Sequence, residues 1–355
     1  MSPPRVAALI VSYEAPAHLI KDLLDSLRHE PLTRVLVVDN ASEDDGGVSL
    51  AQERGAEILS LPTNRGFGAA VNAGMALLDE EWVLVLNFDI TAQRGAVNAL
   101  LRAATHPKIA SIAPKILLFD HPKHLDCVGT QVHPGFLAAN RGIGQPDLGQ
   151  FDANEPILGS CFGAAFINRK AFQDVGDLWA PYFLYYEDID WCWRARIKGW
   201  TILSAPQSTF VHRHSWHLRH KPTAEKYYWV QSNLLLALVR LGEPKRAILE
   251  ILRRIKALLH RASKEPDLRG ATLRLLIRFV SLFPKAVASR FTTQKGRVVS
   301  DGMLFAFSEG HRGCFDDTGY SPLQGDLPRR SAHAHRWSLY GNDGDKETAL
   351  GKKTE

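Results

Sequence analysis

Apolar and polar positions along the first 120 residues form a pattern that predicts short buried strands separated by helices. Continuous apolar runs are typical of strands that are covered on both faces, and apolar residues at helical spacing lie between these runs. The predicted strands are 6–12, 34–40, 57–61 and 81–89, and the predicted helices are 18–29 and 66–78. This alternation indicates an α/β fold with a parallel sheet, in which ligands bind beyond the carboxyl ends of the strands.

Beyond residue 120 the pattern changes. Residues 120–156 are rich in Gly, Pro, His and Asp with little periodicity, which predicts a long functional loop region. A strand is expected within 159–169, a helix that begins with acids at 187–200, two short strands at 201–206 and 208–214, and three helices at 226–241, 245–262 and 271–283. From about residue 299 the chain has no periodicity, so a weakly ordered tail is expected over 299–355.

Composition narrows the class of protein. Hydrophobic residues make up 45% and charged residues 23% of the 355 residues, which excludes wholesale disorder, a collagen-like repeat and a polytopic membrane protein. The apolar run near the N-terminus reads as a first buried strand rather than a signal peptide. The four cysteines include no CxxC pair, so a thiolate metal site and a disulfide framework are not expected, and a cytoplasmic location fits.

Positive charge is concentrated in one segment. Residues 241–300 contain 14 Lys and Arg against 4 Asp and Glu, whereas the remainder of the chain contains 29 basic and 34 acidic residues. Within this segment, residues 245–290 mix Leu and Ile with Arg and Lys. That mixture suits a helix lying on an anionic membrane surface, and equally a helical subdomain with a solvated basic face.

Polar side chains close two of the predicted strands. Asp39 and Asn40 end the second strand, where a carboxylate can bind a base or ribose, or can cap the next turn with Ser42. Asp89 ends the fourth strand, two residues after Asn87. A carboxylate there can ligate Mg²⁺ or Mn²⁺ together with substrate phosphates, or can simply be a turn residue.

A glycine-rich loop opens the helix at 66–78. Asn64, Gly66 and Gly68, followed by Asn72, combine a tight turn with a helix N-terminus whose free N–H groups suit a diphosphate. The alternative is a strand-to-helix turn with glycines that serve packing.

Glu187 and Asp188 follow the aromatic run 182–186 and begin a helix. Acids in a first turn are ordinary partners of the helix dipole. Acids directly behind bulky apolar residues suggest in addition a carboxylate at the floor of a substrate pocket, where the helix N-terminus holds it ionised to act as a general base.

Four histidines follow the last predicted strand, at His212, His214, His217 and His220. Such a cluster can be a solvated surface patch. One imidazole of the cluster can instead complete a metal site, because imidazole suits Mn²⁺ and other transition ions.

Taken in order, these pieces resemble the inverting glycosyltransferases of family 2, and in particular their bacterial rhamnosyltransferase-like branch. The similarity spans about residues 5–220, and the ordered set is specific although no single piece is. The matching segments are VSYE (11–14), VVDNAS (37–42), NRGFGAAVNAG (64–74), LNFD (86–89), RGIGQPDLGQFD (141–152), GSCFGAAFINR (159–169), FLYYEDIDWCWRARIKGW (183–200) and VHRHS (211–215).

The resemblance implies a GT-A fold and a set of residue roles. It implies a Rossmann-like nucleotide half at about 1–90 and an acceptor half at about 91–220, which together form a domain at 1–220, followed by the basic helical extension at 221–298. A nucleotide-sugar donor and a divalent cation, Mg²⁺ or Mn²⁺, are expected. The roles implied are donor binding by Ser12, Tyr13, Glu14, Asp39, Asn40, Asn64, Gly66, Gly68, Asn72 and Asn87, metal binding by Asp89 and His212, catalysis by Asp188 as base beside Glu187, and acceptor contact by Tyr185 and Trp191.

Three positions depart from the family pattern. Asn87 replaces the first acid of the metal motif, Phe88 stands where this branch commonly has proline, and Glu14 stands where many relatives have Asn. The first two put the metal requirement in question, because Asp89 is then the only carboxylate of that motif.

The expected function is transfer of a sugar, with rhamnose favoured, to a glycan or lipid-linked acceptor with inversion, in cell-surface polysaccharide synthesis. The expected location is cytoplasmic, with peripheral attachment at the inner face of the membrane if residues 245–290 bind lipid. A nucleotidyltransferase is the alternative enzyme, although its Gly-rich basic loop is absent after the first strand. A non-catalytic glycan-binding module is the alternative from another class. Nucleic acid is not an expected partner, because the basic segment lacks the interleaved aromatic residues of a stacking platform.

Overall fold

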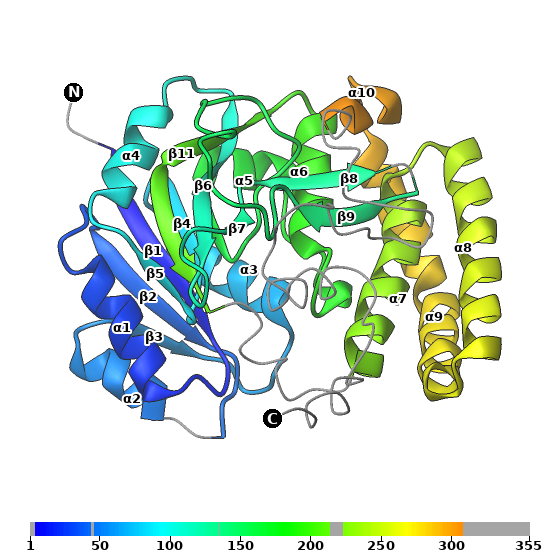
Figure 1. The fold of residues 1–355 in the computed structure, drawn as a ribbon, viewed down its shortest axis with the longest axis horizontal. Helices are drawn as coiled ribbons and strands as arrows, with labels where there is room; N and C mark the ends of the chain where they lie inside the picture. The colour runs from blue at the N-terminus through cyan, green and yellow to red at the C-terminus, as the bar shows by residue number, and fades with distance from the viewer. Residues whose placement is uncertain (1–3, 44–45, 134, 214–222, 308–355) are drawn as a thin grey trace, which may run out of the picture.

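The computed structural model describes residues 4–43, 46–133, 135–213 and 223–307. Figure 1 shows a twisted sheet with its helices on the left, a group of C-terminal helices on the right, and helix α6 (Glu187–Ile197) between them. The site expected from the sequence therefore begins at the helix where these two parts of the molecule meet.

A mixed sheet of nine strands forms the larger part of the described chain, in the order β3-β2-β1-β4-β10-β6-β11-β5 with β7 paired to β6. The first four strands are parallel, as the apolar runs predicted, whereas β10 runs antiparallel to both of its neighbours. The strands are β1 (Val6–Ser12), β2 (Arg34–Asp39), β3 (Glu57–Ser60), β4 (Trp82–Asn87), β5 (Ile90–Ala92), β6 (Ile109–Leu118), β7 (Leu125–Cys127), β10 (Ala164–Asn168) and β11 (Thr201–His212).

Helices cover both faces of this sheet because successive side chains of each buried strand point to opposite sides. In β1, Val6, Ala8 and Ile10 pack on the face covered by α1 (Ala17–Leu27), α2 (Gly46–Glu53) and α4 (Ala96–Ala103). The alternate β1 residues pack on the other face, beneath α3 (Phe67–Leu77), α5 (Arg169–Val175) and α6. Strands β1 and β4 are therefore buried on both sides, which explains their continuous apolar runs, whereas the edge strand β3 is partly exposed.

Helix α6 is buried almost all round. Its side chains divide between the core under the sheet and a second core formed with the C-terminal helices, and every α6 residue except Asp188 is buried. A helix enclosed on all sides fixes the position of its first turn, so the polar group at that end has a defined place.

The C-terminal helices are α7 (Thr223–Leu241), α8 (Pro244–Lys264), α9 (Arg269–Gln294) and the short α10 (Asp301–Phe305). Helices α7 and α8 agree with the predicted 226–241 and 245–262, whereas α9 begins near the predicted residue 271 but continues well beyond residue 283. Helix α7 is the central member, since it packs against α9, α8 and α6. Among the described residues, none of the helices combines the length and apolar character that crossing a membrane requires.

Three expectations about the later chain were wrong. The loop region predicted at 120–156 contains β7 and a two-stranded hairpin, β8 (Thr130–His133) and β9 (Leu137–Asn140). The two short strands predicted after residue 200 are one strand, β11, whose pairing with β6 shifts between Ala205 and Thr209. Residues 300–307 are not part of a loose tail, because Leu304 and Phe305 of α10 are buried in the second core.

The remainder of the predicted tail, 308–355, lies outside the described residues. The domain boundaries expected near residues 90 and 220 stay predictions. Strand β4, which ends before residue 90, pairs directly with β10, which follows it, so the two expected halves share one continuous sheet.

Candidate active site

The carboxyl ends of three neighbouring strands bring the first group of expected residues together. Ser12 ends β1 and lies opposite Asp39 at the end of β2, and Asn87 at the end of β4 lies opposite Val11. Ser12 is fully buried, and its hydroxyl has no hydrogen-bond partner among the described residues. This edge of the sheet is where a parallel α/β fold binds its ligand.

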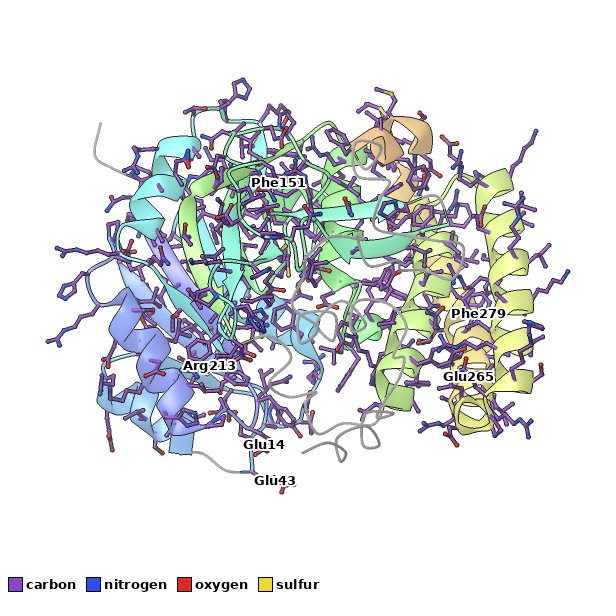
Figure 2. All side chains as sticks on the ribbon, viewed as in Figure 1. Glu14, Glu43, Phe151, Arg213, Glu265 and Phe279 are labelled. Carbon is purple, nitrogen blue, oxygen red and sulfur yellow. The ribbon has the colours of Figure 1, made fainter. Side chains whose placement is uncertain are left out.

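Asp39 organises the loop beside this edge. Its Oδ1 accepts hydrogen bonds from the backbone N–H (3.0 Å) and hydroxyl (2.7 Å) of Ser42. The Ser42 hydroxyl in turn accepts from the N–H of Glu14 at 2.9 Å, and the Glu14 carboxylate accepts from the N–H of Glu43 at 2.7 Å. Glu14 and Glu43 are both labelled in Figure 2. Asp39 thus makes the turn-capping contact with Ser42 that the sequence offered as one of its two roles.

Two asparagines link this loop to the glycine-rich loop. Asn40 donates to the side-chain oxygen of Asn64 at 2.9 Å and accepts from the N–H of Arg65 at 3.0 Å. The Asn64 oxygen also accepts from the N–H of Gly66 at 3.0 Å. The residues after β2 and those before α3 therefore form one hydrogen-bonded unit.

The glycine-rich loop makes closer protein contacts than the sequence predicted. Gly66 has φ +84°, and a Cβ there would lie 2.3 Å from the Phe183 carbonyl oxygen. A Cβ on Gly68 would lie 3.4 Å from the Cβ of Glu187. The Asn72 amide exchanges two hydrogen bonds with the backbone of Leu178, at 2.8 and 2.9 Å. These glycines are needed for close packing, which is the alternative interpretation of the loop. Asn72 holds α3 to the chain before α6.

The aromatic run before α6 is a strained turn. Phe183, Tyr185 and Tyr186 have φ values of +66°, +69° and +73°, which cost L-residues about 1–2 kcal/mol each. Phe183 also has ψ −58°, and the N–H of Leu184 donates to the Tyr182 carbonyl at 2.8 Å, so residues 182–184 form a γ-turn of the rare, strained kind. Such conformations persist only where surrounding contacts enforce them.

The strained turn presents Glu187 and Asp188 at the start of α6. Asp188 Oδ2 accepts from the N–H of Phe162 at 3.4 Å and Oδ1 from that of Ile189 at 2.7 Å. Burial nevertheless raises the pKa of Asp188 to about 6, against these two hydrogen bonds, which favour the ionised form. Burial therefore outweighs the start of the helix in setting this pKa, but a pKa of about 6 still leaves Asp188 ionised at neutral pH. Burial and the charge of Asp188 raise the pKa of Glu187 well above its usual range.

His212, at the end of β11, joins two carboxylates. Its Nε2 lies 3.2 Å from Asp89 Oδ1 and its Nδ1 lies 2.6 Å from Asp126 Oδ2. All three side chains are buried. Burial opposes the charged imidazolium, but the two carboxylates raise the pKa of His212 well above its usual value.

The separation of the Asp89 and His212 donor atoms suits a divalent ion, but these two residues supply only part of the ligands that such an ion needs. Two donors that bind one ion at about 2.1 Å from neighbouring positions lie about 3 Å apart, which is close to the separation of Asp89 Oδ1 and His212 Nε2. Within the described ranges, no group of three or more His, Cys, Asp and Glu residues is arranged to hold a metal ion. Two protein ligands are enough where substrate phosphates and water complete the shell.

Residues 159–163 connect Asp188 to the corner formed by Asp89 and His212. The N–H of Phe162 donates to Asp188. The carbonyl of the next residue, Gly163, accepts from the N–H of Asn87 at 2.9 Å. Asn87 in turn lies two residues before Asp89. Asp188, Asn87 and the Asp89–His212 pair therefore belong to one region of the molecule.

Trp191 does not fit its expected role. It is fully buried beneath the sheet, with its ring against those of Phe162 and Phe172 at centroid distances of 5.8 Å, so an acceptor cannot reach it in this conformation.

Tyr185 is partly exposed, and Lys226 Nζ lies 5.9 Å from its ring centroid. Phe88 is buried in the core. Tyr13 is partly exposed just beyond the β1 edge. His214, His217 and His220 lie outside the described residues.

Sequence reasoning missed two contributors to this site. Asp126 lies in a region without periodicity, where no pattern distinguished it. Asn233 lies within α7 and donates to three carbonyls of the strained turn. The polar group Gln231–Ser232–Asn233 inside an otherwise apolar helix was a signal that could have been followed.

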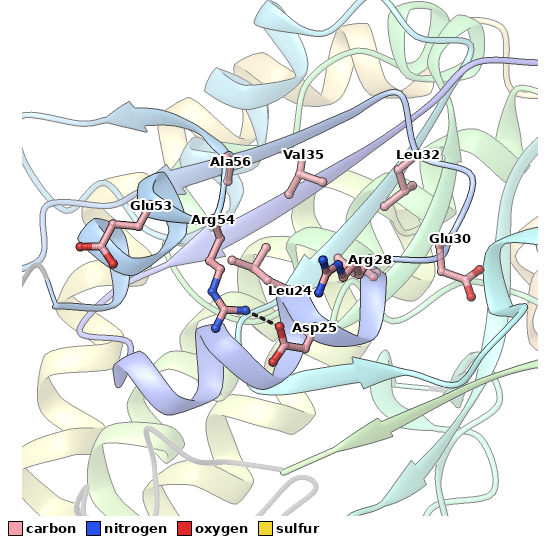
Figure 3. A pocket seen from close by; sticks show the side chains of 11 residues that line it. Leu24, Asp25, Arg28, Glu30, Leu32, Val35, Glu53, Arg54 and Ala56 are labelled. Atoms are coloured by element: carbon pink, nitrogen blue, oxygen red, sulfur yellow. Dashed lines mark hydrogen bonds and ion pairs between the residues drawn. The ribbon is translucent and has the colours of Figure 1, made fainter.

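A cavity of about 680 Å³ lies elsewhere, between α1, α2 and the start of β2 (Figure 3). Its lining includes the ion pair of Asp25 with Arg54, together with Leu32 and Val35. Because it sits beside the amino end of β2, at the opposite edge from Ser12 and Asp39, it is separate from the residues described above.

Comparison with known proteins identifies the family. The model of "Glycosyl transferase family 2" matches residues 8–176. An N-acetylglucosaminyl-diphospho-decaprenol L-rhamnosyltransferase from Mycobacterium tuberculosis (strain CDC 1551 / Oshkosh) is 30% identical over 236 residues, which cover 57% of this chain and 74% of that protein. A pre-mycofactocin glycosyltransferase from the same organism is 28% identical over 234 residues, 63% of this chain and 46% of that protein. The chain belongs to glycosyl transferase family 2, and it is a glycosyltransferase.

Solved structures agree on the fold. GalNAc-T7 with UDP, GalNAc and Mn²⁺ superposes with a TM-score of 0.50 at 11% identity, covering 66% of this chain and 51% of that one. TarS from S. aureus superposes with a TM-score of 0.50 at 15% identity, covering 91% and 59%. The expected GT-A fold with C-terminal helices is therefore confirmed, and the nucleotidyltransferase and non-catalytic alternatives are set aside.

Proposed function

We propose that the protein transfers a sugar, with rhamnose favoured, from a nucleotide-diphosphate donor to a hydroxyl of a lipid-linked or glycan acceptor, with inversion, in cell-surface polysaccharide synthesis. The rhamnosyltransferase relative supports the choice of sugar and of a lipid-linked acceptor. The donor would bind at the carboxyl ends of β1, β2 and β4, near Ser12, Tyr13, Asp39 and Asn87.

One observation carries the proposal. Asp188 is the single residue of buried helix α6 that is not itself buried, and its carboxylate lies next to the segment that contacts the end of β4. A partly buried carboxylate with a pKa of about 6 is ionised at neutral pH and basic enough to accept a proton.

In the proposed reaction, Asp188 takes the proton of the acceptor hydroxyl while the hydroxyl oxygen attacks the anomeric carbon of the donor sugar. The bond from that carbon to the diphosphate breaks as the new glycosidic bond forms, and the diphosphate leaves with the electron pair. Attack opposite to the leaving group inverts the anomeric configuration in a single displacement. Burial and the charge of Asp188 raise the pKa of Glu187, so Asp188, which is the less buried of the two side chains, is the proposed base.

Asp89 and His212 are the residues that would hold Mg²⁺ or Mn²⁺. When bound, the ion would supply charge neutralisation for the leaving diphosphate. Asp126 would fix the imidazole so that Nε2 faces Asp89, an arrangement common where a histidine binds a metal. The presence of Mn²⁺ in the structure of GalNAc-T7 supports a divalent ion, and leaves the choice between Mg²⁺ and Mn²⁺ to experiment.

The direct test is incubation with a panel of nucleotide sugars, including dTDP-rhamnose, with release of nucleoside diphosphate as the readout. Asp188→Asn should bind donor normally and transfer sugar ~10²–10⁴-fold more slowly, the range for a lost general base. Asp79→Asn is the matched control, since Asp79 pairs with Arg5 at the opposite edge of the sheet. Normal transfer by Asp188→Asn would show that another group is the base.

We also propose that α8 and α9 attach the enzyme to the cytoplasmic face of an anionic membrane. Both helices expose large apolar side chains. On α8, Ile248, Leu252 and Leu259 share one side of the helix, since they are spaced by four and seven residues, and Lys245 and Lys256 flank them. On α9, Leu273, Ile277 and Val280 form a similar exposed stripe. The combination of apolar stripe and basic flank suits an anionic lipid surface.

Vesicle co-sedimentation of the full chain tests this attachment. The wild-type protein should sediment with phosphatidylglycerol-containing vesicles and not with pure phosphatidylcholine. A double variant, Leu252→Gln with Val280→Gln, should lose sedimentation, whereas Leu148→Gln, which changes an even more exposed leucine in a loop outside these helices, should not. Equal sedimentation of wild type with both kinds of vesicle, or none with either, would contradict the proposal.

A further inference from the structure

The strained turn that presents Glu187 and Asp188 is held by the C-terminal helices rather than by the sheet domain alone. Asn233 Nδ2 of α7 donates to the carbonyls of Tyr182 (3.0 Å), Leu184 (2.7 Å) and Tyr185 (2.9 Å). These three acceptors lie within the segment that has three positive φ values. One side chain thus satisfies the carbonyls that the γ-turn and the left-handed residues direct to one side.

Arg278 of α9 fixes Asn233 in turn. Its Nη1 donates to the Asn233 oxygen at 2.8 Å and to Ser232 Oγ at 2.7 Å. Its Nη2 donates to the carbonyls of Pro181 and Tyr182. Because the Asn233 oxygen accepts from Arg278, the amide is oriented with its NH₂ group toward the turn.

A ring contact and an ion pair reinforce the same connection. The Phe183 ring stacks on Trp229 of α7 at a centroid distance of 4.8 Å and an angle of 18°. Arg240, two turns after Asn233 on α7, donates to both oxygens of Asp190 at 2.8 and 3.1 Å. Helix α7 therefore holds the chain on both sides of Glu187 and Asp188.

We infer that Asn233, oriented by Arg278, is a positioning residue for the Glu187–Asp188 pair. The helical extension therefore completes the active site, in addition to its proposed contact with the membrane. This inference rests on the proposed role of Asp188. It does not place Asn233 or Arg278 against substrate. Without the clamp, the residues of positive φ lose the contacts that compensate for their strain, and the turn can relax to other conformations.

The test compares two residues whose side-chain amides donate hydrogen bonds to backbone carbonyls in different segments of the chain. Asn233→Leu removes the donors to the turn while keeping similar volume. Gln294→Leu is the matched control, because Gln294 Nε2 donates to the carbonyls of Arg240 and Leu241 at the far end of α7. Both variants remove an amide–carbonyl contact between the C-terminal helices and the backbone, but only one of them touches the turn.

We expect Asn233→Leu to lower kcat by about 10²-fold, the scale of a small displacement of a catalytic group, with KM for the donor within about twofold. The acidic limb of its pH–rate profile should shift, since the burial of Asp188 changes. Gln294→Leu should keep kcat and the profile. Arg278→Lys, which retains charge but not the planar fork, should fall between them. A uniform loss of rate in both variants, with unchanged profiles, would mean a structural role only.

Hydrogen exchange separates this inference from the proposed function. Amides of residues 182–190 should exchange faster in Asn233→Leu than in wild type or Gln294→Leu, whatever reaction the protein catalyses. Unchanged exchange in that segment would overturn the positioning role. Faster exchange together with a fully active Asp188→Asn variant would support the clamp and overturn Asp188 as the base.

Discussion

Gly66 and Phe183 are in direct backbone contact. The N–H of Phe67, which follows Gly66, donates to the Phe183 carbonyl at 2.8 Å, and a Cβ at residue 66 would lie 2.6 Å from the Phe183 Cα. The loop expected to bind donor phosphates and the turn that carries Glu187 and Asp188 thus lie against each other. A change on one side of this contact is transmitted to the other.

Replacement of Gly66 should therefore disrupt both loops. Gly66→Ala should cost more stability than the ~1 kcal/mol of positive φ alone, and should lower kcat, because Phe183 must move. Gly55→Ala is the control, since Gly55 has φ +83° with nothing within 4 Å of a Cβ. Chemical denaturation and steady-state rates give the comparison. Equal effects of the two substitutions would show that the contact with Phe183 is unimportant.

The pH–rate profile should report Asp188. With a pKa of about 6, Asp188 is protonated and inactive as a base below that pH, so kcat/KM should rise between about pH 5 and 7 and then level off. Glu187→Gln should leave this limb in place, because Asp188 rather than Glu187 is the proposed base. A limb that moves by a full pH unit in Glu187→Gln would show that Glu187 carries the charge.

The same raised pKa should lower stability as the pH rises. The folded state holds the Asp188 proton up to about pH 6, whereas the unfolded chain releases it near pH 4, so stability is lost as the pH rises between these values. Asp188→Asn should thus be more stable than wild type at pH 7, with the difference shrinking toward pH 4. Thermal unfolding across this range measures it, and a pH-independent difference would contradict the burial of the charge.

Asp126 should govern the affinity of the metal corner. Asp126→Asn removes the carboxylate that orients His212 and should weaken Mn²⁺ binding ~10–100-fold. Titration followed by electron paramagnetic resonance of Mn²⁺, with nucleoside diphosphate present, detects this without a reaction. Asp120→Asn changes an exposed acid of the same region and should leave affinity unchanged. Identical Mn²⁺ affinity in Asp126→Asn and wild type would exclude the orienting role.

The buried ion network at Asp190 should be a stability element. Asp190 is fully buried and pairs with Arg194 at 2.6 Å and with Arg240 at 2.8 Å, and these cations lower its pKa to about 2. Asp190→Asn leaves two buried guanidinium groups with less compensation and should cost about 3–5 kcal/mol by urea unfolding. Because the folded pKa is lowered, this contribution is present above about pH 4 and is lost toward pH 2. A loss below 1 kcal/mol would contradict the burial of the pair.

Much of the fold was predictable because the central strands are buried on both faces. Strands β1, β2 and β4 contain uninterrupted apolar runs, whereas the edge strand β3 is short and partly exposed. Each of the four was located to within about two residues. Strand β10 has the same apolar character as β4, so its antiparallel direction could not be read from side-chain pattern. The hairpin β8–β9 was missed because each of its strands has only four residues, which is too short for periodicity to detect.

The site was predictable where its residues follow strands and less so where contacts come from distant segments. Asp39, Asn87, Asp89 and His212 all end or follow strands at the same edge, and the sequence identified them. Tertiary packing brings in two further residues from distant parts of the sequence. Asp126, which contacts His212, is 86 residues away from it, and Asn233, which contacts Tyr182, is 51 residues away. Trp191 was expected to contact the acceptor, but helix α6 turns it into the core.

The last described helix has a consequence for biosynthesis. Phe305 of α10 packs against Phe136 and Trp193, at centroid distances of 5.6 and 5.4 Å, and so fills space between the β8–β9 hairpin and α6. A nascent chain emerging from the ribosome lacks this ring until almost the whole described sequence has been translated. The enzyme therefore completes its core late in synthesis, and premature stop codons before residue 300 should yield protein recognised by chaperones and proteases rather than a shortened catalyst.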